Sequence, residues 1–131
     1  MSVEFNEATR ALLDGKNFAT VATLNKDGAP QTSLVWIGRE GDTVVFSTTA
    51  GRLKARNLAR DPRISLTVFD LANPYESVDI RGTAELIDDP KKELPHRLSH
   101  KYLSQDPPNE SDDEVRLIVR VTPQKVTGFK V

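Results

Sequence analysis

The feature that most constrains the fold is a series of short segments in which apolar and polar residues alternate. Ile64, Leu66 and Val68 alternate in this way, and Val78 and Ile80 continue the pattern in the next segment. A period of two is typical of strands with one buried face. The expected strands cover residues 18–24, 31–38, 43–48, 64–68, 78–86 and 115–121, with 126–131 as a further candidate. The expected strands do not alternate regularly with helices along the chain, which favours an antiparallel sheet over a parallel one.

Three other segments carry apolar residues at helical spacing. They begin after Asn6, at Arg52 and at Asp88, and they end near residues 14, 60 and 103. Residues 71–75 and 105–113 are expected to be loops, because they contain proline and lack periodicity. Six or seven antiparallel strands with short helices predict a mainly β protein, whose sheet closes into a barrel with helices over its ends.

The length of 131 residues suits a single domain over 1–131. A net charge of −1 provides no broad positive field, so neither nucleic acid nor a membrane is expected as a partner. The absence of cysteine excludes disulfides, thiolate metal sites and cysteine nucleophiles. The first residues lack the basic segment followed by an apolar segment that marks an export signal. No run of apolar residues is long enough to span a membrane, so a cytoplasmic location is expected.

The segment from Ser47 to Leu58 carries the clearest chemical signal. A helix N-terminus favours acidic residues, yet the first turn here holds Arg52 and Lys54 and no acid. An anion bound by these cations, by backbone N–H groups and by nearby hydroxyls would explain the arrangement, and phosphate is the expected anion. A solvated basic helix face is the competing interpretation.

In their order along the chain, several pieces together resemble a known family. They are Phe18–Leu24, Asp27–Gln31, Phe46–Thr49 and, most specifically, Arg52–Arg63. This sequence resembles the flavin-binding split β-barrel superfamily (pyridoxamine 5′-phosphate oxidase-like), and within it the deazaflavin (coenzyme F420)-dependent branch. The resemblance implies a six- to seven-stranded antiparallel split barrel that forms a homodimer with cofactor sites at the interface.

The resemblance also implies roles for particular residues. The cofactor phosphate would be held by Arg52 and Lys54 with the hydroxyls of Ser47, Thr48 and Thr49. The ring system would lie along residues 31–36, including Gln31 and Ser33, while Trp36 either stacks on the ring or fills the barrel. Pro74 and Tyr75 would cover the ring from the second subunit. Arg56, with Arg60 and Arg63, would extend a positive strip toward the anionic tail of F420, or would form a solvated helix face.

The function that this resemblance implies is hydride transfer from reduced F420 to a small organic acceptor, with FMN as the alternative cofactor. The competing classes are a non-catalytic flavin or F420 carrier or sensor, and a phosphate-binding module without redox chemistry. No residue is assigned as catalytic, because hydride chemistry belongs to the cofactor. No histidine follows Val115, so oxidation of pyridoxamine phosphate is not expected, and no haem motif is evident.

Other candidates have simpler explanations. His96 and His100 lie four residues apart, as metal ligands do, but no third ligand is apparent, so surface or interface histidines are expected and no metal site. Asp79 and Glu85 are interpreted as solvent-facing strand residues rather than an acid–base pair. Gly28 and Gly41 are interpreted as turn residues.

Overall fold

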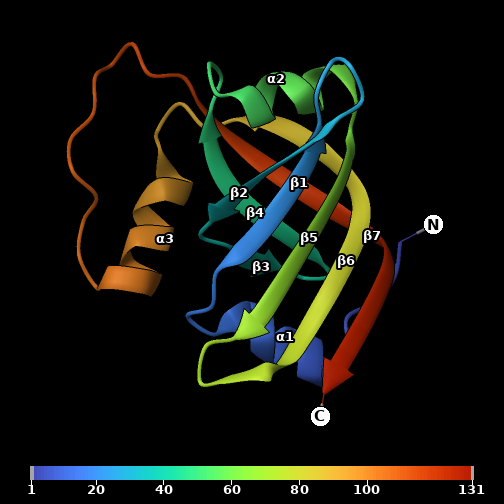
Figure 1. Ribbon diagram of the computed structural model, residues 1–131. Coiled ribbons are helices and arrows are strands. Elements are labelled where there is room, and N and C mark those ends of the chain that lie inside the picture. Colours follow the sequence, from blue (N-terminus) through green and yellow to red (C-terminus); the bar gives the residue numbers. More distant parts are fainter. Residues whose placement is uncertain (1, 131) are drawn as a thin grey trace.

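Figure 1 shows the computed structural model, in which residues 2–130 are described. Seven antiparallel strands form one sheet in the order β2-β1-β5-β6-β7-β4-β3. The strands are β1 (Ala19–Leu24), β2 (Pro30–Val35), β3 (Gly38–Glu40), β4 (Thr43–Thr49), β5 (Arg63–Asp70), β6 (Asn73–Asp88) and β7 (Arg116–Lys130). The helices within this range are α1 (Glu7–Asp14), α2 (Leu53–Arg60) and α3 (Glu93–Leu103). The predicted fold class, a mainly β antiparallel split barrel, is confirmed.

The sheet curves around its core but does not close into a barrel, so the predicted closure was wrong: β2 and β3 do not pair with each other and form the two edges of the sheet. The sequence predicted one strand over 31–38, and this was wrong: β2 ends at Val35, and the chain then crosses to the other edge. Ile37 in the crossing is fully buried, and α3 supplies its backbone partners. The Ile37 amide donates to Tyr102 Oη at 3.1 Å, and its carbonyl accepts from Lys101 Nζ at 2.7 Å. Side chains of α3 therefore replace a neighbouring strand where the chain passes from β2 to β3, a region that we call the split.

The long β6 and β7 also differ from expectation. Residues 73–75 belong to β6 rather than to a loop, and only Leu71 and Ala72 remain in the turn after β5. The two expected C-terminal strands are one strand, β7, whose register with β6 shifts between Arg81 and Gly82. A Cβ at Gly82 would lie 2.1 Å from the Thr122 carbonyl oxygen, so only glycine fits this crossing. Val131, the last residue of the expected final strand, lies outside the described residues.

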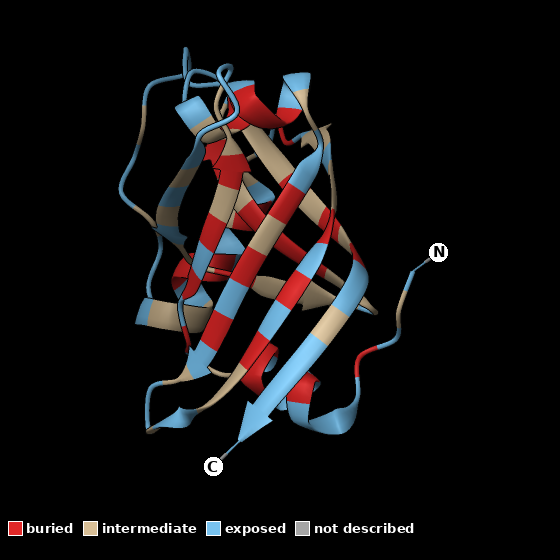
Figure 2. Cartoon of the chain, turned by 45° about the vertical axis from the view of Figure 1, so that its right-hand side comes forward, coloured by how far each residue is buried: buried red, intermediate tan, exposed pale blue. Residues whose placement is uncertain are grey.

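Buried residues alternate with more exposed ones along β5, as the period of two predicted, and Figure 2 shows bands of buried residues along the strands. The main core joins strand residues such as Val21, Phe46 and Ile80 to Leu12 and Leu13 of α1. The predicted cap of α1 is confirmed, because Asn6 Oδ1 accepts from the Thr9 amide at 2.8 Å. No helix of the described chain is long and apolar enough to cross a membrane.

Helix α3 begins at Glu93, five residues after the expected start at Asp88. Lys92 occupies the N-cap position without a side-chain bond, and the buried Asp89 carboxylate caps the first turn instead, because it accepts from the amides of Glu93 and Leu94, both at 3.0 Å. Leu94 and Leu98 are buried as expected, but Leu103 is 53 % exposed. The irregular segment after α3 runs beside that helix before it enters β7 (Figure 1).

Candidate functional site

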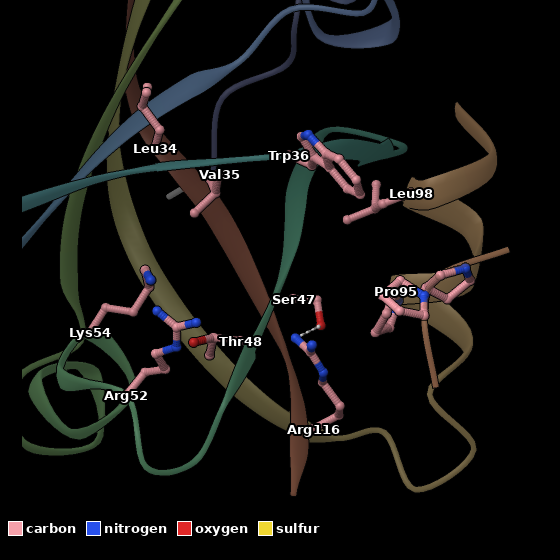
Figure 3. Close-up of a pocket in the computed structure, with 12 residues that line it drawn as sticks. Leu34, Val35, Trp36, Ser47, Thr48, Arg52, Lys54, Pro95, Leu98 and Arg116 are labelled. Atoms are coloured by element: carbon pink, nitrogen blue, oxygen red, sulfur yellow. Dashed lines mark hydrogen bonds between the residues drawn. The ribbon is translucent and has the colours of Figure 1, made fainter. Parts of the chain in front are cut away.

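A cavity of about 310 Å³ lies at the split, between β2, β4 and the start of α2. Helix α3 and the segment that follows it bound the cavity on the other side (Figure 3). Its lining consists of Leu34, Val35, Trp36, Ser47, Thr48, Arg52, Lys54, Pro95, Leu98, Pro107, Pro108 and Arg116. Five predicted site residues are therefore brought together: Trp36, Ser47, Thr48, Arg52 and Lys54.

The start of α2 is the positively charged part of the cavity. Arg52 occupies the N-cap position without a side-chain cap bond, and the first turn contains no acidic residue. The N-terminal end of a helix is itself electropositive, so the two cations add to an unfavourable local charge. An anion at this position would relieve that charge.

Arg52 and Lys54 point into the cavity near one another (Figure 3). Within residues 2–130, neither forms an ion pair with a carboxylate. Burial, followed by the nearby Arg52 charge, lowers the pKa of the Lys54 ammonium. An anion beside Lys54 would offset both effects, and no carboxylate among the described residues pairs with this ammonium.

Two buried hydroxyl groups lack hydrogen-bond partners among the described residues. Thr48 Oγ1 lies beside Arg52 (Figure 3), and Ser33 Oγ lies on β2. Buried polar atoms are almost always hydrogen-bonded, so the Thr48 hydroxyl is free to bond to a ligand or to an ordered water. Together with the two unpaired cations, Thr48 fits a phosphate group.

Arg116 is a further cation in the cavity that was not predicted from the sequence. Its Nη1 donates to Ser47 Oγ at 3.3 Å, while Nε and Nη2 each donate to the Glu110 carboxylate at 3.0 Å. The hydrogen bond from Arg116 holds the pKa of Glu110 below its usual range. Arg116 is therefore already paired, unlike Arg52 and Lys54. Arg116 reaches the cavity because it pairs with Thr49 in the register of β7 with β4.

The opposite wall of the cavity is apolar. Trp36 stacks on Tyr102 with ring centroids 5.2 Å apart, and Tyr102 stacks on Phe18 with centroids 5.7 Å apart. Trp36 therefore packs against α3 rather than filling the barrel. With Leu34, Val35 and Leu98 it provides a surface suited to a flat ring system.

Comparison with known proteins identifies the family. The family model described as pyridoxamine 5′-phosphate oxidase matches residues 5–130. The chain belongs to this family. The predicted membership of the pyridoxamine 5′-phosphate oxidase-like superfamily is confirmed, and with it the flavin-binding split-barrel fold.

Two similar proteins can be compared with this chain directly. The pyridoxine/pyridoxamine 5′-phosphate oxidase of Kineococcus radiotolerans is 30 % identical over 103 residues, which are 79 % of this chain and 43 % of that protein. The chain thus spans less than half the length of this curated relative. A solved structure named F420 Reductase superposes with a TM-score of 0.84 at 29 % identity, covering 94 % of this chain and 98 % of that one.

More distant structures share the fold alone. Rv2991 of Mycobacterium tuberculosis has a TM-score of 0.79 at 21 % identity, covering 98 % of this chain and 86 % of that one. General Stress Protein 26 of Bacillus anthracis has a TM-score of 0.71 at 14 % identity, covering 94 % and 92 %.

The remaining predicted site residues of this pyridoxamine 5′-phosphate oxidase family member lie outside the cavity lining. The Gln31 amide donates to the Thr32 carbonyl, and Thr49 lies at the end of β4. Arg56 lines a separate hollow with Asn25 and Asn57, on another side of α2. Pro74 and Tyr75 are exposed at the start of β6, at the end of the sheet opposite α2 (Figure 1), so they lie away from the cavity of their own chain.

The proposed positive strip is weaker than the sequence indicated. Arg63 pairs with Asp61 at 2.7 Å, and Arg60 donates to the Leu24 carbonyl. Only Arg56 of the three is without such a contact among the described residues. The carboxylates Asp79 and Glu85 are both exposed, which agrees with their interpretation as solvent-facing. Gly28 and Gly41 have positive φ angles of 87° and 60°, as turn residues require.

Proposed function

We propose that this protein is an oxidoreductase that binds coenzyme F420 and transfers hydride to a small organic acceptor, with FMN as the second candidate cofactor. The observation that carries the proposal is the combination of Arg52, Lys54 and the unpartnered Thr48 hydroxyl at the start of α2. These groups fit the phosphate that both cofactors contain.

The chain's own residues have separable tasks in this proposal. Lys54 and Arg52 bind the phosphate through charge-assisted hydrogen bonds, and Thr48 Oγ1 donates a further one. Leu34, Val35 and Trp36 line the adjoining apolar wall and exclude water from the ring. The bound cofactor supplies the hydride chemistry, so the protein needs to position it and admit an acceptor.

The similarity to the F420 Reductase structure over nearly the full length of both chains supports F420 ahead of FMN. The exposed Arg56 adds a modest contribution, since an anionic tail beyond the phosphate would be attracted to it. A non-catalytic carrier of the same cofactor remains the competing class, and turnover distinguishes the two.

A homodimer is part of the proposal. Leu34 on the edge strand β2 is 69 % exposed, and with Phe18, Val35 and Trp36 it lines a shallow, mainly apolar hollow of about 320 Å³ beside the cavity. A second copy would cover this surface and bring its own Pro74 and Tyr75 within reach of the ring.

The test of the proposed function is a fluorescence titration of the protein with F420 and with FMN. F420 should bind more tightly, and its advantage should shrink as salt is added, because contacts to the tail involve exposed charges. Reduced F420 should be consumed when candidate acceptors are added. Tighter binding of FMN would overturn the cofactor ranking, and F420 binding without turnover would favour the carrier.

Replacing Arg52 and Lys54 together by Ala should raise the Kd of either cofactor at least about tenfold, because charge-assisted hydrogen bonds are lost. Arg56→Ala is the matched control on the same helix, and it should change FMN binding little. An unchanged Kd in the double variant would exclude this phosphate site.

A further inference from the structure

A cluster of two histidines and one aspartate lies outside the cavity, where α3 meets the segment that follows it. His96 and His100 occupy successive turns of α3, and their rings lie 4.6 Å apart. The chain then leaves the helix and returns, so that Asp106 Oδ1 lies 2.6 Å from His100 Nε2 and 3.6 Å from His96 Nε2. The sequence spacing indicated only the two histidines, because the third group depends on the path of the chain after the helix.

The three side chains match the requirements of a transition-metal site. One ligand atom from each lies within 4.8 Å of the others. Bonds of about 2.0 to 2.1 Å to tetrahedral zinc place ligand atoms about 3.3 Å apart, so small side-chain rotations would suffice. Two imidazoles with one carboxylate form a donor set that zinc accepts, and such three-ligand sites leave a fourth position for water.

The rest of the chain offers little competition for such an ion. The sequence contains only these two histidines and no cysteine, so the strongest protein donors for a borderline-soft metal are all in this cluster.

The location of the cluster gives it a consequence for the cavity. Asp106 is followed directly by Pro107 and Pro108, which line the cavity wall. We propose that His96, His100 and Asp106 form a site for a divalent transition metal ion of the zinc class, which fastens the segment after α3 to that helix. The bound ion would hold Pro107 and Pro108 over the cavity, and binding of the ion does not depend on the identity of the cofactor.

The first experiment is calorimetric titration of the tag-free full chain with zinc chloride. We expect one ion per chain, with a Kd that rises at least about tenfold in His96→Gln, His100→Gln and Asp106→Asn. These three side chains are exposed, so the variants should fold, and circular dichroism checks this. Asp112→Asn removes an exposed carboxylate from the same segment and is the matched control. No binding, or binding unchanged in the three variants, would overturn the site.

The second experiment tests the fastening with a protease that cleaves after glutamate, since Glu110 and Glu114 lie in the segment. We assume that cleavage requires the segment after α3 to detach from the helix and that the detached segment does not bind zinc. Zinc at about a hundred times its Kd should then slow cleavage in this segment by up to about a hundredfold. The effect should vanish in Asp106→Asn and persist in Asp112→Asn. Cleavage that zinc leaves unchanged in the parent protein would refute the fastening.

Discussion

At the scale of single residues, Thr48 shows how a binding group can cost stability. Its buried hydroxyl has no hydrogen-bond partner among the described residues. Thr48→Val keeps the side-chain shape and removes the unpartnered oxygen, so the free energy of unfolding of the cofactor-free protein should rise by about 1 kcal/mol. The Kd of F420 or FMN should rise about threefold to tenfold, because a hydrogen bond to phosphate is lost. Chemical denaturation and cofactor titration measure the two effects.

Thr43→Val is the matched control for this prediction, because it makes the same change in the same strand. Thr43 Oγ1 donates to the Glu40 carbonyl at 2.7 Å, so its loss should lower the free energy of unfolding and leave the cofactor Kd unchanged. If Thr48→Val behaved like Thr43→Val, the Thr48 hydroxyl would have no role in binding.

At the scale of elements, α3 depends on a cap that lies outside the helix. Asp89 accepts two amide hydrogen bonds from the first turn, and Asp89→Ala should lower the free energy of unfolding by about 1 to 2 kcal/mol in urea denaturation. Asp88→Ala is the control: Asp88 is exposed, and removing its carboxylate should have little effect. Equal stability of both variants would show that the helix does not rely on this cap.

At the scale of the whole molecule, one chain leaves apolar surface beside the cavity uncovered. Light scattering at micromolar concentration should give the mass of a dimer. Leu34→Glu, which adds a charge to a side chain that is 69 % exposed, should shift the protein to monomer and weaken cofactor binding. Leu103→Glu changes an exposed leucine at the end of α3 and should leave the dimer intact. A monomeric parent protein would exclude a site shared between subunits.

The sequence by itself determined the features that depend on local periodicity and local charge. Alternation at residues 64–68 and 78–86 predicted strands, Asn6 predicted a cap, and Arg52 with Lys54 predicted an uncompensated positive helix start. These are properties of neighbouring residues, so they are visible without the fold.

Only the tertiary structure decided where distant segments meet. The break between β2 and β3 exists because Tyr102 and Lys101, about sixty-five positions away, bond to Ile37. Arg116 reaches Ser47 through the pairing of β4 with β7, and Asp106 reaches His96 because the chain turns back after α3. Such contacts depend on strand register and chain path, which are set by burial across the whole sheet and leave no periodic signal in the sequence.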